Sequence, residues 1–160
     1  MNTPIVQIDI ENPNSLQIPE IEKLERYLVL ICKQLDRSQA KLSVYIADEI
    51  EMQSINLAHR NINKSTNVLS FPFERPSGLP EEIETYFIGD IIICPSVLER
   101  EAKEQVKSSE AHWAHLFIHG ILHLYDYDHV SQSDAEVMES LEINLLKQLG
   151  FHNPYDMDPI

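Results

Sequence analysis

The alternation of apolar and polar positions predicts four strands along the chain. Residues 4–10 and 42–46 alternate as a strand with one buried face does. Residues 68–73 form a short run rich in β-branched and aromatic side chains, which favour strands. Residues 86–94 include three consecutive isoleucines and are apolar on both faces, so we expect a central strand that is covered on both sides.

Helical spacing of apolar residues, together with capping signals and Pro95, predicts five helices between and after these strands. The fourth helix is apolar almost all round apart from its histidines, which is typical of a helix buried in the middle of a domain. The resulting order, β-α-β-α-β-β-α-α-α, predicts an α+β fold. The five expected helices cover residues 19–36, 48–58, 95–107, 109–125 and 133–150.

Capping signals mark the expected starts of two of these helices. Asp48 precedes Glu51 by three residues and Ser133 precedes Glu136 by three, and both pairs fit a capping box. Residues 59–67 follow the first of these helices. They are polar and basic, and we expect them to form a loop.

We expect one domain over residues 1–150, because a chain of 160 residues is the size of a single domain with one core. Its fold class is α+β, with a mixed four-stranded sheet and helices packed around the buried histidine-bearing helix. Residues 151–160 contain two prolines and two aspartates, and we expect a flexible tail there.

Composition limits the partners and the compartment. The chain has 26 acidic and 12 basic residues, and its formal charge of −14 argues against indiscriminate binding to nucleic acid or to an anionic membrane. Cys32 and Cys94 lie far apart within apolar runs, so we expect buried free thiols in a reducing compartment. The sequence has neither a signal peptide nor a run long enough to span a bilayer, which predicts a cytoplasmic protein without a membrane segment.

Three histidines have the spacing of a metal site. His119 and His123 are four residues apart on the expected buried helix, so their rings project from one face, and His129 follows six residues later. Three imidazoles and one open position are the ligand set of a catalytic zinc site. His115 is eight residues from His123, about 12 Å along a helix. We therefore expect His115 to support the ligands or to line the pocket wall, and His112 to lie at the surface.

Two aspartates flank the third histidine. Asp128 is expected either to orient a histidine through its other ring nitrogen or to cap the loop. Asp126 fits a polar residue at the helix C-terminus, because aspartate tolerates left-handed dihedral angles. Gly120 occupies the position directly after the first histidine, where a zinc peptidase of the H-E-x-x-H type has its general base. Gly120 cannot relay a proton, so it indicates close packing instead and speaks against peptidase activity.

One stretch reverses the overall sign of charge. Between residues 53 and 80, Glu74 is the only acidic residue, against Arg60, Lys64 and Arg75. Two interpretations stay open: a solvated loop with incidental charge, or a phosphate-binding edge beside the metal. In the second, Arg60 is the best candidate because its guanidinium can hold a phosphodiester with two hydrogen bonds, and Lys64 and Arg75 are further RNA-binding candidates.

Four stretches of the chain carry motifs that are specific in combination. They are His119-Gly120-x-Leu122-His123-Leu124 with Tyr127-Asp128-His129, Ile55-Asn56-Leu57 leading to Arg60, Thr66-Asn67-Val68-Leu69-Ser70-Phe71-Pro72, and Gly89-Asp90-Ile91. With these motifs, residues 40–149 resemble the YbeY family of bacterial rRNA-maturation endoribonucleases. One departure is Asp126, which stands where the family usually has glycine. It leaves the turn feasible and adds a carboxylate near the expected metal.

The resemblance implies a single-domain α+β hydrolase with one Zn²⁺ per chain, held by His119, His123 and His129. It also implies metal-dependent endonucleolytic cleavage of single-stranded RNA, maturation of the 3′ end of small-subunit ribosomal RNA, and ribosome quality control. Arg60 falls on the family's functional arginine. The implied partners are ribosomal RNA and the small ribosomal subunit, and we expect a monomer.

Neither the nucleophile nor a general base is identified from the sequence, and both water and the RNA 2′-hydroxyl stay open as nucleophiles. Two other functions remain as alternatives. The first is a zinc-dependent hydrolase of peptides or small molecules, against which Gly120 and the basic stretch speak. The second is a non-enzymatic ribosome-assembly factor whose structural zinc is closed by a fourth protein ligand, with Asp126 and Asp128 as candidates.

Overall fold

The four expected strands form one mixed sheet in the order β1-β2-β4-β3. The structure, a computed structural model, describes residues 3–80 and 85–156. The strands are β1 (Ile5–Glu11), β2 (Gln39–Ile46), β3 (Val68–Pro72) and β4 (Phe87–Ile93). The helices are α1 (Ile21–Gln34), α2 (Glu49–Arg60), α3 (Pro95–Glu104), α4 (Ser109–Leu124) and α5 (Gln132–Gln148). The element order and the α+β class predicted from the sequence are confirmed.

Strand β4 is central, as its apolar sequence predicts. It pairs in parallel with β2, where Ile91 lies opposite Val44, and antiparallel with β3, where Ile91 lies opposite Ser70. Strand β1 completes the sheet by pairing in parallel with β2. Alternate residues of β4 therefore enter different layers: Ile91 joins the main core, whereas Ile92 packs into a smaller cluster with α2.

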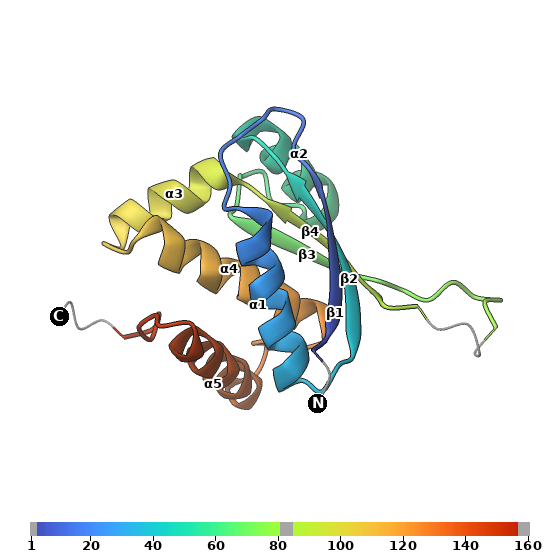
Figure 1. Cartoon of the computed structure of the whole chain (residues 1–160). Coiled ribbons are helices and arrows are strands. Elements are labelled where there is room, and N and C mark those ends of the chain that lie inside the picture. The colour runs from blue at the N-terminus through green and yellow to red at the C-terminus, as the bar shows by residue number, and fades with distance from the viewer. Residues whose placement is uncertain (1–2, 81–84, 157–160) are drawn as a thin grey trace.

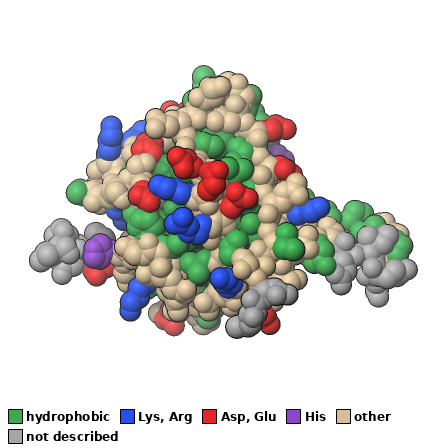
Figure 2. Space-filling view, viewed as in Figure 1, with side chains coloured by type: hydrophobic (Ala, Val, Ile, Leu, Met, Phe, Trp, Pro, Cys, Tyr) green, Lys and Arg blue, Asp and Glu red, His purple; other side chains and the backbone are tan. Residues whose placement is uncertain are grey.

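The helices lie in two layers on the sheet. Helices α1 and α4 pack on one face, and α5 packs against the outer side of α4 (Figure 1). Helix α2 contributes Met52 to the cluster on the other face, beside Leu69 of β3. No helix within the described ranges is long and apolar enough to cross a membrane. The face that α1 presents carries acidic and basic side chains side by side, not a continuous basic surface (Figure 2).

Helix α4 is the buried helix that the sequence predicts, and a glycine lets it approach the sheet. A Cβ atom at Gly120 would lie 3.2 Å from the Ser70 Oγ and 3.3 Å from the Val68 Cγ2, which is closer than most side chains pack. The Ser70 hydroxyl donates a hydrogen bond to the Gly120 carbonyl at 2.9 Å. This contact fixes α4 directly against β3, which confirms the close packing expected at Gly120.

Two predicted helix boundaries are corrected. Helix α2 extends beyond residue 58, so Arg60 lies in its last turn and not in the expected loop, and Asn61 ends the helix with φ 58°. Helix α5 is capped by Ser131, whose side chain accepts from the Asp134 N–H, and not by Ser133. Asp48 does cap α2, since its carboxylate accepts from the Glu51 N–H at 2.8 Å.

The segment that follows α5 is ordered against the domain as far as residue 156. Phe151 packs on the main core, and Lys107 donates to the Pro154 carbonyl at 3.1 Å. Residues 151–156 thus make specific contacts with the domain, residues 157–160 lie outside the described part of the chain, and flexibility of the tail stays a prediction. Cys32 and Cys94 are buried and free, as expected.

We predict that Gly89→Ala lowers the free energy of unfolding by about 3 kcal/mol or more. Gly89 has φ 144°, and a methyl group there would overlap the backbone oxygen of Phe71 and lie 2.9 Å from the Leu124 Cδ2. The matched control is Gly78→Ala, where φ is also positive at 91° but the space is open. It should cost only about 1 kcal/mol. Urea unfolding measures both, and equal losses would contradict the close approach.

Candidate metal centre

Helix α4 and the turn after it bring three histidines to one point. The Nε2 atoms of His119 and His123 are 3.1 Å apart. The ring of His129 has its centroid 5.2 Å from that of His123 and 5.7 Å from that of His119. One nitrogen from each of the three rings lies within 4.8 Å of the others. The spacing seen in the sequence thus becomes a convergent set of imidazoles.

The turn that carries His129 back to α4 is a Schellman motif. The Asp126 N–H donates to the His123 carbonyl at 3.1 Å, and the Tyr127 N–H donates to the Leu122 carbonyl at 3.0 Å. Asp126 has φ 70°, which is the left-handed conformation expected of it. The backbone thus reverses within two residues after α4, and the next few residues reach the histidine pair.

Hydrogen bonds at the far nitrogens determine how these two rings are protonated. The His123 Nδ1 lies 2.9 Å from the Tyr127 carbonyl oxygen. Because a carbonyl can only accept, His123 must carry its proton on Nδ1. The His119 Nδ1 faces a carboxylate oxygen of Glu142 at 3.2 Å and donates in the same way. Burial, and then the neighbouring His119, lower the pKa of His123 and favour its neutral form.

A bound cation would remove the repulsion between the two Nε2 atoms that this protonation leaves. Two unprotonated Nε2 atoms face each other at 3.1 Å, where their lone pairs repel. Two nitrogens bound at about 2.1 Å to one tetrahedral zinc lie roughly 3.4 Å apart, close to this spacing. The donor set therefore fits a metal ion. Within residues 3–80 and 85–156, no carboxylate or cysteine joins the three histidines as a fourth ligand, so the site keeps an open position.

Glu142 of α5 supports the histidines from behind. Its side chain is 0% exposed, and its Oε2 accepts from the His115 Nε2 at 2.7 Å and from the His119 Nδ1 at 3.2 Å. Its Oε1 accepts from the Tyr155 hydroxyl at 2.9 Å. Burial alone raises the pKa of Glu142, but the hydrogen bonds from the two histidines outweigh it and lower the pKa to about 2. An ionised carboxylate thus orients the His119 ring.

The group of His115, His119 and Glu142 also has metal-ligand spacing, since one ligand atom from each lies within 4.8 Å of the others. We interpret it as a hydrogen-bond network, because both histidine nitrogens are placed to donate to the carboxylate. His115 therefore supports His119 through Glu142. It does not line the cavity beside the three histidines.

His112 differs from its prediction. It was expected at the surface, but it is 3% exposed, because α3 packs on this part of α4. Its Nε2 lies 3.1 Å from the Glu101 Oε1. Burial lowers the pKa of His112, with the Glu101 hydrogen bond acting in the opposite direction. His112 thus belongs to the packing between two helices and not to the metal centre.

Sequence reasoning did not identify Glu142 or Tyr155 as part of the centre. A signal existed for Glu142, which follows Met138 by four residues and precedes Leu145 by three, and so lies on the buried face of α5. A carboxylate on an apolar helix face needs buried partners. Tyr155 gave no comparable signal, because it lies in a short polar segment after the last helix.

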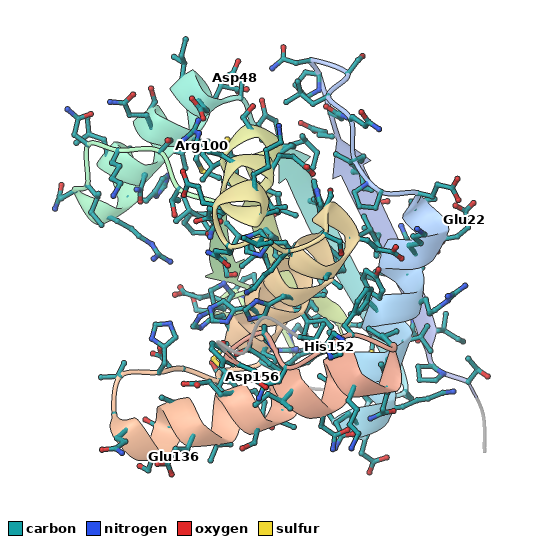
Figure 3. All side chains as sticks on the ribbon, turned by 90° about the vertical axis from the view of Figure 1, so that its left-hand side faces the viewer. Glu22, Asp48, Arg100, Glu136, His152 and Asp156 are labelled. Atoms are coloured by element: carbon teal, nitrogen blue, oxygen red, sulfur yellow. The ribbon has the colours of Figure 1, made fainter. Side chains whose placement is uncertain are left out.

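A cavity of about 440 Å³ opens beside the histidines. Arg60 enters it from the last turn of α2, while Ser70 comes from β3. Helices α2 and α5 lie on opposite sides of α4 (Figure 3). The residues lining the cavity are Arg60, Ser70, Pro72, His123, Asp126, Tyr127, Asp128 and His129.

The structure does not bring every basic candidate to this cavity. Arg60 lines it, but Lys64 does not. Arg75 lines a different cavity, together with Arg37 and Tyr125. Of the three basic residues predicted to contact RNA, only Arg60 shares a space with the histidines, and RNA contact by Lys64 and Arg75 stays a prediction.

The two aspartates make the lining acidic. The Asp128 Oδ1 accepts from the His129 N–H at 2.7 Å, which supports the loop-capping interpretation. Asp126 and Asp128 with Arg60 give the lining a net charge of −1, and a divalent cation would change it to +1. Attraction for an anion therefore depends on the metal.

Comparisons with known proteins agree on one family. The family model described as Endoribonuclease YbeY matches residues 7–150. Endoribonuclease YbeY of Francisella philomiragia subsp. philomiragia is 47% identical over 150 residues, which cover 94% of this chain and 95% of that protein. Its namesake in Francisella tularensis subsp. novicida is 48% identical over 150 residues, covering 94% and 93%. The solution structure of TM1509 from Thermotoga maritima has a TM-score of 0.56 at 26% identity, covering 95% of this chain and 99% of that one.

We predict one divalent metal ion per chain, lost in His119→Ala and in His123→Ala. Elemental analysis of dialysed protein measures it. The matched control is His59→Ala, which removes an exposed histidine of α2 that belongs to neither group with metal-ligand spacing. Metal at 100 times its dissociation constant should raise the melting temperature by roughly 5–10 °C. Unchanged metal content in both α4 variants would contradict the site.

Proposed function

The chain belongs to the YbeY endoribonuclease family, and from this we propose that it is a single-strand-specific metallo-endoribonuclease that matures the 3′ end of small-subunit ribosomal RNA and acts in ribosome quality control. The observation that carries the proposal is one cavity that combines the histidine site with the Arg60 guanidinium. Its substrate is single-stranded RNA. It works as a cytoplasmic monomer on the small ribosomal subunit, and residues 1–150 are its catalytic domain.

Zinc is the proposed metal, one ion per chain. Three neutral imidazoles with an open position favour Zn²⁺ over the hard cations Mg²⁺ and Ca²⁺, which prefer oxygen ligands. When bound, the ion supplies Lewis acidity and positive charge at the scissile phosphodiester. The metal ligands are His119, His123 and His129. Glu142 and the Tyr127 carbonyl hold the first two rings with Nε2 directed at the ion.

Arg60 binds the scissile phosphate. Its guanidinium has donors in a planar fork and stays charged, so it stabilises negative charge that builds up on the phosphate oxygens. Its place in the last turn of a capped helix holds it more firmly than the expected loop would. Asp128 keeps the His129 backbone in place on the opposite side of the same cavity.

The two alternative functions fit the site less well. A zinc peptidase of the H-E-x-x-H type needs an acidic base after the first histidine, and here Gly120 is packed against Ser70 instead. A structural zinc would be closed by a fourth protein ligand. Among the residues that the structure covers, Asp126 and Asp128 line the cavity without joining the histidine group.

We predict that Arg60→Ala lowers kcat/KM for a single-stranded ribosomal RNA fragment about 100-fold while the metal content stays unchanged. Arg60→Lys should recover part of the loss, since it keeps the charge but not the fork. The matched control is Arg26→Ala, which removes an exposed arginine of α1, and this variant should cleave normally.

In the same assay, the wild-type chain should cleave a double-stranded RNA much more slowly than the single-stranded fragment. The end groups of the products identify the nucleophile: a 2′,3′-cyclic phosphate with a 5′-hydroxyl indicates the RNA 2′-hydroxyl, and a 5′-phosphate with a 3′-hydroxyl indicates water. If wild type, His123→Ala and Arg60→Ala cleave alike, the cleavage comes from a contaminant and the proposed function fails.

We also predict that RNA binding depends on the metal. The metal-loaded chain should bind a single-stranded 2′-O-methyl RNA about tenfold more tightly than the metal-free chain, because the ion reverses the sign of the cavity lining. Asp126→Asn should strengthen binding by the metal-free chain, since it removes one negative charge and asparagine also tolerates the left-handed φ of 70°. Fluorescence anisotropy measures both, and equal affinities of all forms would contradict the charge argument.

A further inference from the structure

The carboxylate of Glu142 has its two oxygens held by different parts of the chain. Its Oε2 accepts from His115 and His119, both on α4. Its Oε1 accepts from the Tyr155 hydroxyl at 2.9 Å, and this is the one hydrogen bond to Oε1 seen in the described residues. Because the Glu142 side chain is 0% exposed, water cannot take the place of that donor at the surface.

Tyr155 is presented to Glu142 by a built turn. The Asn153 side chain accepts from the Tyr155 N–H at 2.8 Å, and the Asp156 N–H donates to the Asn153 carbonyl at 3.2 Å. Pro154 stands at the second position of this turn, where its fixed φ is favoured. Lys107 donates to the Pro154 carbonyl at 3.1 Å and so ties the turn to the end of the α3–α4 connection.

The tyrosine ring reaches inward although part of it is at the surface. The residue is 40% exposed, yet its ring packs edge-on against His115 with a centroid distance of 5.3 Å, and its hydroxyl lies 3.3 Å from the His115 Nε2. Tyr155 does not line the cavity that Arg60 shares with His123 and His129. Any effect of Tyr155 on the centre must therefore pass through Glu142 and His119.

We propose that Tyr155 is a positioning residue of the metal centre, and that residues 153–156 thereby form part of that centre. Its hydroxyl holds the Glu142 carboxylate in the orientation that accepts the His119 Nδ1–H, and this leaves the His119 Nε2 directed at the ion. The His119 bond, at 3.2 Å, is longer than the bond from His115 at 2.7 Å. Without the hydroxyl, Oε1 has no donor among the described residues, so the carboxylate is free to rotate and the longer His119 bond is lost first.

This inference rests on the metal of the proposed function, not on cleavage of RNA. Partners that orient a metal-bound histidine typically contribute 10–100-fold to metal affinity. Tyr155→Phe removes the hydroxyl and keeps the ring against His115. The matched control is Tyr45→Phe, which also removes a hydroxyl that donates to a carboxylate, that of Glu51 at 2.5 Å, on the other face of the sheet.

The experiment measures the zinc affinity of the full chain by competition with a chromophoric chelator, and the visible d–d spectrum of the Co²⁺-substituted protein. Tyr155→Phe should weaken zinc binding about 10–100-fold and alter the Co²⁺ spectrum. Tyr45→Phe should do neither. Excess zinc should restore RNA cleavage by Tyr155→Phe. Urea unfolding of each metal-free variant separates a general loss of stability from a change at the metal.

Three results would overturn the inference. Unchanged zinc affinity and an unchanged Co²⁺ spectrum in Tyr155→Phe would show that the hydroxyl does not position the centre. Equal weakening in Tyr45→Phe would show a general effect of stability. A second equivalent of metal that is lost in Glu142→Gln would make Glu142 a ligand and not a support. If Tyr155→Phe weakens zinc binding but the wild-type chain does not cleave RNA, the inference stands and the proposed function fails.

Discussion

The close approach of α4 to β3 is the constraint on which the rest of the molecule depends. Gly120 has no side chain, so the helix backbone can accept a hydrogen bond from Ser70 in the sheet. The contact lies between the two helical metal ligands in sequence, so it fixes their position relative to β3. The wall of the cavity opposite the histidines then comes from β3 and from the end of α2. A larger residue at this point would move the ligands away from the arginine that faces them.

Charged side chains lie on two sides of the histidines. On the inner side, the ionised Glu142 is sealed from water and neutralises the partial charge of the histidine N–H groups that point at it. On the outer side, Asp126 and Asp128 face solvent within the cavity and oppose Arg60. The overall charge of −14 disfavours the binding of anionic ligands in general. A cation bound by the histidines would make this one site attractive to them. The acidic composition and an RNA substrate are therefore compatible.

Local patterns predicted most of the fold, and the errors fall where a distant contact decides. Apolar patterning, composition and capping signals located the strands and helices that the structure describes, and the histidine spacing located the group of ligands, because all of these depend on neighbours in sequence. The role of Glu142 could not be derived, because it depends on the packing of α5 against α4. The family motif singled out Arg60, whereas the separation of Arg75 from the histidines could not be predicted, because it depends on how the elements pack. The contacts of the segment after α5 could not be predicted, because one of its partners, Lys107, lies far along the chain.

The Schellman turn after α4 has a consequence for how the molecule assembles. All three histidines fall within residues 119–129, so the loop between the first and the last ligand is short and closing it loses little chain entropy. Arg60 reaches the same cavity only after strands β2, β3 and β4 have paired, which are contacts of high sequence separation and form slowly. In refolding of the complete chain, the short loop between the metal ligands can therefore close before the distant strand pairings place Arg60 beside it.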